Sequence, residues 1–137
     1  MNALYDNAAY AMQTGNFDWV GWNLIVSAWD GVPSFFASHN TIAAIKLAGF
    51  NELGTSLLIT EKTVTTTGIA QTNNVIIPGI TAGNEVTWFT VARQQATHDN
   101  STLICFIDDA EGLPFTANGL DVELDPDWLM SRGWYRP

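Results

Sequence analysis

The chain has 137 residues, of which 47% are apolar and 14% charged, a composition typical of one folded domain rather than of a disordered segment. The sequence holds no run of about 18 apolar residues, so no membrane-spanning helix is expected. Its 14 acidic and 5 basic residues give a formal net charge of -9, which disfavours nucleic acid and anionic membranes as partners.

The first element expected is a short amphipathic helix over about residues 3–14. Asn2 is a candidate N-cap, and Gly15 can adopt the left-handed conformation that ends a helix. The residues expected on its apolar face are Leu4, Ala8, Ala11 and Met12. Because so short a helix is marginal alone in water, we expect it to lie on a sheet. The opening has no basic segment and contains Asp6, so no secretory signal is expected.

The middle of the sequence indicates antiparallel strands. In WNLIVSAWD (22–30), Leu24, Val26 and Ala28 point one way and Ile25, Ser27 and Trp29 the other, so a strand with one or both faces covered is expected. A short helix is expected over 41–47, ending near Gly49. From Leu57 on, strand-like segments alternate with turn clusters, namely SLLIT, KTVTTTG, NNVIIPG, EVTWFTVAR and TLICFID. The predicted fold is mainly β, an antiparallel β-sandwich or small barrel with a short N-terminal α-helix.

The C-terminal part of the sequence separates into an acidic strand and an aromatic arm. In LDVELD (120–125), apolar residues alternate with carboxylates, which predicts one more strand with an acidic face. We expect a single β-rich domain over 1–125 and an arm over 126–137. The arm's large apolar side chains would either pack on its own core or grip a neighbour. The candidate interface residues are Trp128, Leu129, Met130, Arg132, Trp134, Tyr135 and Arg136.

Residue types that carry out catalysis or bind metal are present without the spacing that such chemistry needs. Cys105 is the only cysteine and lies in the apolar run LICFI, so a buried, inert thiol is expected. His39 and His98 lie in polar segments far from any cysteine, which lacks the spacing of a metal site. Asp108 and Asp109 could form an acid and base pair, and DDAEG could bind calcium, but solvated turn residues are favoured. We therefore predict no catalytic residue, no cofactor and no metal.

Three blocks of the sequence, in order, resemble a family of small structural proteins of tailed bacteriophages. The opening is similar to the family's "NALYD-x-A" helix and "G-x-(I/F)-DW" turn, with matches at Asn2, Ala3, Leu4, Tyr5, Asp6, Ala8, Gly15, Asp18 and Trp19. The segment from LLITEKTVTTTG to VAR resembles its "KTVT" hairpin and core strand, and LICFIDDAEGLPFTANG resembles its "GLP-x-TPNG" close. Residues 30–54 lack the family's "IP-x-G-x-R" stretch, and the arm is longer and more aromatic than the family pattern.

The resemblance implies a non-enzymatic virion component, namely a head decoration or cement protein on the capsid exterior, with a tail or neck protein as the alternative. The partners it implies are the major capsid protein or other virion proteins, with self-association as a dimer or trimer. The location would be the virion, after assembly in the host cytoplasm. A module that binds host glycans is a further alternative, because the sequence has six tryptophans, Trp19, Trp22, Trp29, Trp88, Trp128 and Trp134.

Overall fold

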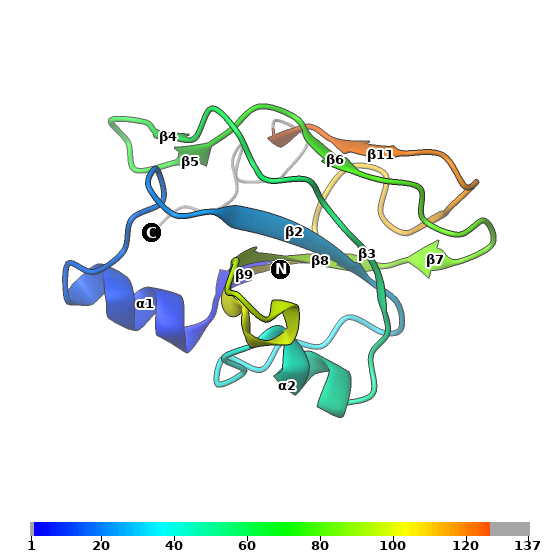
Figure 1. Ribbon diagram of the computed structural model, residues 1–137, viewed down its shortest axis with the longest axis horizontal. Coiled ribbons are helices and arrows are strands. Elements are labelled where there is room, and N and C mark those ends of the chain that lie inside the picture. The colour runs from blue at the N-terminus through cyan, green and yellow to red at the C-terminus, as the bar shows by residue number, and fades with distance from the viewer. Residues whose placement is uncertain (1, 127–137) are drawn as a thin grey trace.

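The computed structural model describes residues 2–126, and an open, five-stranded antiparallel sheet forms the centre of this part of the chain (Figure 1). Its strand order is β1-β9-β8-β2-β3. The strands are β1 (Asn2–Leu4), β9 (Thr102–Ile107), β8 (Trp88–Arg93), β2 (Leu24–Trp29) and β3 (Glu52–Thr55). The protein is therefore mainly β, as predicted.

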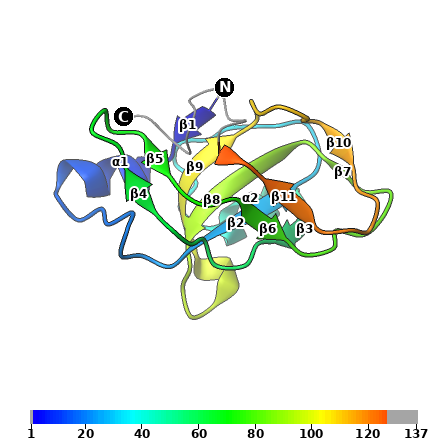
Figure 2. The ribbon, with the colours of Figure 1, turned by 90° about the horizontal axis from the view of Figure 1, so that it is seen from above.

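Three two-stranded antiparallel sheets complete the β structure of the described residues. They pair β4 (Thr63–Val64) with β5 (Ala70–Gln71), β6 (Val75–Ile77) with β11 (Val122–Leu124), and β7 (Glu85–Val86) with β10 (Phe115–Thr116). The pairs β4–β5 and β6–β11 lie over one face of the central sheet, which makes the layered arrangement of a sandwich (Figure 1). Figure 2, seen from above, shows β6–β11 crossing in front of β2 and β8, with β4–β5 to the left of them, next to α1.

The helical elements lie below or beside the central sheet in the view of Figure 1, and the first of them lies at the end of the sheet. They are α1 (Asp6–Gln13), α2 (Ile42–Leu47) and the 3-10 helix η1 (His98–Asn100). The predicted second helix and its end are confirmed, since α2 is followed by Gly49 at φ +101°. None of the helices within residues 2–126 has the length and apolar character to span a bilayer.

Strand β2 is confirmed, and of the two possibilities that its sequence leaves open, one or both faces covered, the structure has both faces buried. Leu24, Val26 and Ala28 face a core beneath the small sheets. Ile25 and Trp29 face a second core under α2, where Trp29 stacks on Trp88 with ring centroids 5.5 Å apart. The central sheet therefore separates two cores. Strand β2 carries apolar residues on both faces because each face packs against one of these cores.

The chain between β3 and β4 joins the two β layers. The predicted strand SLLIT is not a regular strand, because β3 ends at Thr55. The backbone N–H groups of Ser56 and Ile59 donate to β2, whereas that of Leu57 donates to the Ile76 carbonyl of β6. The layers approach closely at Gly54, where a Cβ would lie 2.9 Å from Ile77 Cγ2. This contact accounts for glycine at that position.

The N-terminal helix starts later than predicted. Residues 2–4 form strand β1, paired with β9 from Asn2 to Leu4, and α1 begins only at Asp6. Asn2 is not an N-cap; its side chain instead accepts from the backbone N–H groups of Asp108 and Asp109 at 3.2 and 3.1 Å. Long-range pairing with β9 overrides the local helical pattern here.

Of the four residues predicted for the apolar face of the helix, three contribute to a core. Ala8 is buried in the core beneath the small sheets, and half-buried Leu4 and Met12 pack against that core. Leu4 does so from β1 rather than from the helix. Ala11 is half-buried and does not belong to either core.

Candidate functional site

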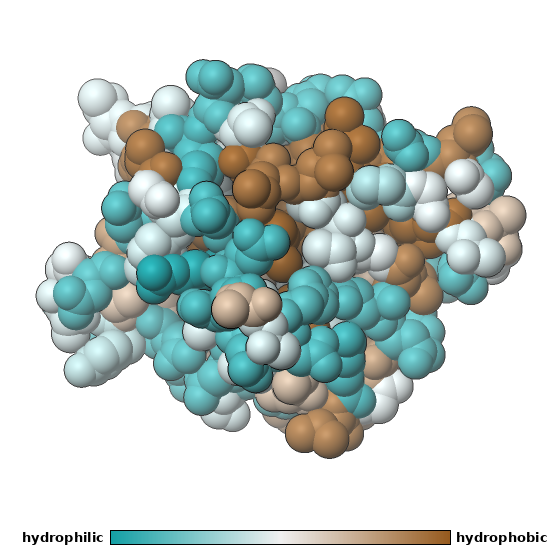
Figure 3. Space-filling view, viewed as in Figure 1, coloured by the Kyte–Doolittle hydropathy of each residue, from teal (hydrophilic) through white to brown (hydrophobic). Residues whose placement is uncertain are grey.

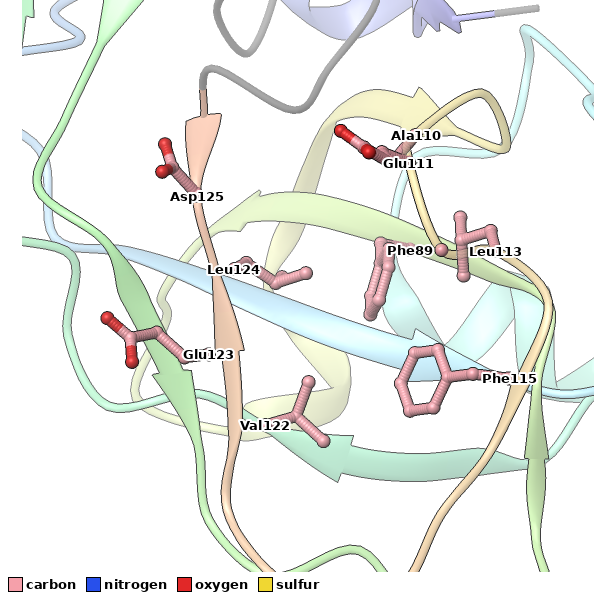
Figure 4. A pocket seen from close by; sticks show the side chains of 10 residues that line it. Phe89, Ala110, Glu111, Leu113, Phe115, Val122, Glu123, Leu124 and Asp125 are labelled. Atoms are coloured by element: carbon pink, nitrogen blue, oxygen red, sulfur yellow. The ribbon is translucent and has the colours of Figure 1, made fainter.

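The described residues form an apolar pocket of about 270 Å3. One wall is β11, which contributes Val122 and Leu124; the opposite wall comes from the segment after β9, with Leu113 and Phe115. Phe89 of β8 lies between the two walls (Figure 4). Figure 4 shows these five apolar side chains directed toward one another across the opening.

Strand β11 has the predicted alternation, and this alternation forms one wall of the pocket. Its register with β6 places Val122 opposite Ile77, Glu123 opposite Ile76 and Leu124 opposite Val75. Val122 and Leu124 are half-buried and face inward, whereas Glu123 is exposed. The acidic face predicted for this strand is therefore the outer face.

A tight turn shapes the opposite wall. Gly112 has φ +91°, a conformation that disfavours residues with a Cβ, and the Leu113 N–H donates to the Ala110 carbonyl at 3.2 Å. Phe115 then pairs with Val86 of β7 and lies 6.5 Å from the Phe89 ring, measured between centroids. The GLP motif thus turns Leu113 and Phe115 toward the pocket.

Three acidic residues, Glu111, Glu123 and Asp125, are among those that line the pocket, and no basic residue of the described chain is. Figure 4 shows the Glu123 and Asp125 side chains on the side of β11 that faces away from the five apolar side chains, and Glu123 accepts a hydrogen bond from the Asn74 side chain at 2.9 Å. The inside of the pocket is therefore apolar and suits an aromatic or aliphatic side chain.

A strip of exposed apolar side chains lies on the small-sheet layer. Leu57, Leu58, Val64 and Ile76 are between 40% and 59% exposed, and the Leu57 N–H donates to the Ile76 carbonyl. Brown, apolar surface is seen over the upper layer in Figure 3. Exposed apolar patches of this kind mark surfaces that contact other proteins.

The candidate reactive residues Cys105, Asp108 and Asp109 lie in or directly after strand β9. Cys105 is buried in β9, and its burial raises the pKa of the thiol to about 12, so it stays protonated at neutral pH. The backbones of Asp108 and Asp109 are held by Asn2. Within residues 2–126, no three side chains of His, Cys, Asp or Glu lie together as metal ligands would.

A cluster of four charged or titratable side chains links α2, β3 and η1. Lys46 Nζ lies 2.7 Å from Asp99 Oδ1 and 3.7 Å from Glu52 Oε1. His98 Nε2 lies 2.8 Å from the same Glu52 oxygen. Sequence reasoning placed His98 in a loop and missed this cluster, because the segment with Lys46 and Glu52 is 46 or more residues away from His98 and Asp99 in the sequence.

Most tryptophans of the described chain are buried in the core rather than exposed on the surface. Trp19, Trp29 and Trp88 are at most 2% exposed. Trp22 is half-buried, with the Arg93 guanidinium 4.5 Å from its ring centroid and Phe17 edge-on at 5.0 Å. The buried rings cannot stack on a sugar, which weakens the glycan-binding alternative.

The seven candidate interface residues of the arm, predicted from the sequence, lie outside the described residues. The described chain ends beside the pocket, because Asp125, one residue before Pro126, is among the residues that line it. Sequence reasoning predicted the alternating strand that became β11 but no pocket. It missed the pocket because only the fold brings residues 110–115 across from β11.

Comparison with known proteins yields no match: neither a protein-family model, nor a curated protein, nor a solved structure is similar to this chain at a significant level.

Proposed function

We propose that the chain is a non-enzymatic structural protein of a tailed-phage particle. Its role would be that of a capsid decoration or cement protein that binds the outer head surface and bridges capsid subunits. The partners would be the major capsid protein or other virion proteins, and the chain would act in the virion. A tail or neck position is the alternative.

The observation that carries the proposal is that the three blocks resembling the phage family contact one another. The Asn2 side chain donates to the Asp109 carbonyl at 3.1 Å, which ties the first block to the last. The Trp19 ring nitrogen donates to the Gln71 carbonyl at 3.4 Å, which ties the first block to the second. Blocks that pack as one unit support a common fold behind the resemblance rather than three independent coincidences.

The resembling residues also have structural rather than chemical roles. Tyr5 is fully buried and its N–H donates to the Ile104 carbonyl. The Asp18 carboxylate accepts from the Gly21 N–H at 2.9 Å and so closes a turn. A motif made of core and turn residues is expected for a module whose function is to keep its shape and bind neighbours.

The exposed apolar strip and the apolar pocket supply surfaces for such neighbours. A small domain bound at many lattice sites gains avidity from repetition, so each contact can be modest. No observation favours the host-glycan module, because three of the four tryptophans in the described part are buried.

The test is binding of the purified full chain to phage heads assembled without it, measured by co-sedimentation. We expect saturable binding in proportion to the number of capsomers. Replacing Trp128 and Trp134 with alanine should weaken it at least about tenfold, whereas Val32→Ala, at a residue 81% exposed, should not. Binding to tails and not to heads would favour the tail alternative, and binding to neither would contradict the proposal.

A further inference from the structure

We propose that strand β11 and the apolar pocket beside it bind one extended segment of a partner protein, which adds to β11 as a further β-strand. The segment carries apolar side chains at alternate positions, with uncharged or basic side chains between them. This inference goes beyond the proposed function, because it names a mode of binding that holds whether or not the protein belongs to a virion. The pocket is the one lined by Phe89, Leu113, Phe115, Val122 and Leu124.

The first observation is that β11 has an open edge. It pairs with β6 in a sheet of two strands, so no strand of the described chain lies along its other side. The outer edge of β6 is already in use, because the Leu57 N–H donates to the Ile76 carbonyl at 3.0 Å. An open edge presents backbone N–H and C=O groups that a further strand can bind, so this sheet can be extended at β11.

The register of β11 shows which backbone groups face the open edge. In an antiparallel pair, successive residues of a strand direct their hydrogen-bonding groups to opposite sides. Ile76 directs its carbonyl to Leu57 and therefore away from β11. Its register partner Glu123 accordingly directs its own N–H and C=O away from β6. In the part of the chain that the structure describes, neither of these two groups has a backbone hydrogen-bond partner at that edge.

The second observation is that the apolar pocket lies along the same edge. Its lining comes from β8, from β11 and from residues 110–115, and no residue of β6 is among the described lining residues. A strand placed there directs every second side chain into the pocket. Because an apolar cavity of about 150 Å3 holds a benzene-sized ring, this pocket of about 270 Å3 has room for a large apolar side chain (Figure 4).

The two observations together favour a strand over other occupants. A helix uses its own backbone N–H and C=O groups internally, and an apolar small molecule has no such groups. Either would cover the Glu123 backbone without pairing it, which is costly for a buried polar group. An extended segment pairs this backbone and fills the pocket at the same time.

Charge favours a different protein over a second copy of this chain. Two copies joined edge to edge about Glu123 would bring two carboxylates opposite each other, and like charges directly opposite across strands are destabilising. Each copy also has a formal net charge of -9, so the copies repel one another before contact. A segment without acidic residues avoids both costs.

The test uses a library of capped heptapeptides with valine, isoleucine, leucine or phenylalanine at every second position and threonine or lysine between them. A control library of the same composition has its apolar residues contiguous, which removes the alternation. Each library is incubated with the immobilised full chain, and bound peptides are identified by mass spectrometry. We expect the alternating library to yield bound peptides and the contiguous library to yield at least about tenfold less.

The informative variant is Glu123→Pro, which removes the N–H at the open edge and no hydrogen bond to β6. Proline is tolerated on an edge strand at a residue whose N–H does not pair. The matched control Glu123→Thr keeps this N–H and loses the same carboxylate, together with its bond from Asn74. We expect Glu123→Pro to weaken binding of a selected peptide at least about fivefold and Glu123→Thr less than about twofold.

Hydrogen exchange of the parent protein gives a readout that needs no variant. The Glu123 amide should exchange fast in the free monomer, because it faces solvent at an open edge. A saturating amount of a selected peptide should slow its exchange at least about tenfold.

Several results would overturn the inference. No binding by the alternating library, or equal binding by the contiguous one, would show that no strand adds here. Equal weakening by Glu123→Pro and Glu123→Thr would assign binding to the side chain rather than to the edge. A Glu123 amide already protected in the free monomer would show an edge closed within the chain, and protection that rises with protein concentration, with a dimer in sedimentation, would assign the edge to a second copy.

Discussion

Asn2 illustrates how a single side chain can act differently from its local pattern. Its position before an apolar helical repeat favours an N-cap. In the structure its amide binds the backbone at 108–109, at the far end of the strand that β1 pairs with. The side chain therefore fastens the first strand to β9, an outcome that depends on partners more than 100 residues away and is not readable from the local sequence.

Two of the buried serines, Ser27 and Ser56, are expected to affect stability in opposite directions when they are replaced by alanine. Ser27 is 1% exposed and its hydroxyl has no hydrogen-bond partner within the described residues. Ser56, 7% exposed, accepts from the Val26 N–H at 2.8 Å and donates to the Leu57 carbonyl at 2.7 Å. Because an unpaired buried hydroxyl is costly and a paired one is not, Ser27→Ala should leave stability unchanged or raise it by up to about 1 kcal/mol.

Ser56→Ala, by contrast, should lower the free energy of unfolding by about 1–3 kcal/mol, since it leaves the Val26 N–H without its acceptor. Urea unfolding of both variants checks the pair. A larger loss for Ser27→Ala than for Ser56→Ala would contradict these hydrogen-bond assignments.

The charged cluster at α2 predicts a pH dependence. The hydrogen bond from Lys46 holds the pKa of Asp99 below its ordinary value of 3.8. A lowered folded-state pKa means that the pair stabilises the fold fully above pH 3.8 and loses this effect as the pH falls through the lowered value. Asp99→Asn should therefore be less stable than the parent protein at pH 7, with Glu52 and His98 still in place.

The difference between the two proteins should shrink as the pH falls below 3.8 and through the lowered pKa of Asp99, because the carboxyl is then protonated in the folded as well as the unfolded state. Thermal unfolding of parent and variant over this range measures it. A difference that stays constant with pH would contradict the Lys46–Asp99 pairing.

At the scale of elements, the sequence predicts best where the side-chain period alone decides the outcome. Strand β2 and the alternation of β11 are confirmed for that reason, whereas the sequence of β2 left open whether one face or both would be buried. The start of α1 and the run SLLIT were predicted wrongly, because each joins a distant partner: β9 for residues 2–4, and both β2 and β6 for 56–59. Local propensity does not contain those partners.

The packing of the N-terminal elements leads to a prediction for α1 and β1. Leu4 and Met12 are half-buried against the core that contains Ala8. Replacing both with aspartate would place two charges at this contact, so we expect a loss of at least about 3 kcal/mol or outright unfolding. Circular dichroism and thermal unfolding measure it.

The matched control is Asn7→Asp with Tyr10→Asp, which adds the same charge on exposed positions of α1, where Tyr10 is 70% exposed. It should keep the fold. If the Leu4 and Met12 variant were as stable as this control, the N-terminal elements would not be part of the core.

At the scale of the whole molecule, the domain combines a rigid, two-core sheet with an acidic outer surface and an aromatic arm at its C-terminal end. The resembling blocks form one connected unit through Asn2 and Trp19, and the described titratable side chains are paired or dispersed rather than gathered around a reactive centre. This arrangement supports the proposal that the protein works by binding neighbours.

The measurement that tests this proposal most directly is cryo-electron microscopy of the phage particle that contains the chain. The account predicts density fitting the five-stranded sheet and its small-sheet layer on the outside of the head, in contact with neighbouring capsomers. Density confined to the tail or neck would contradict the decoration role, and the absence of such density from the particle would contradict the virion proposal as a whole.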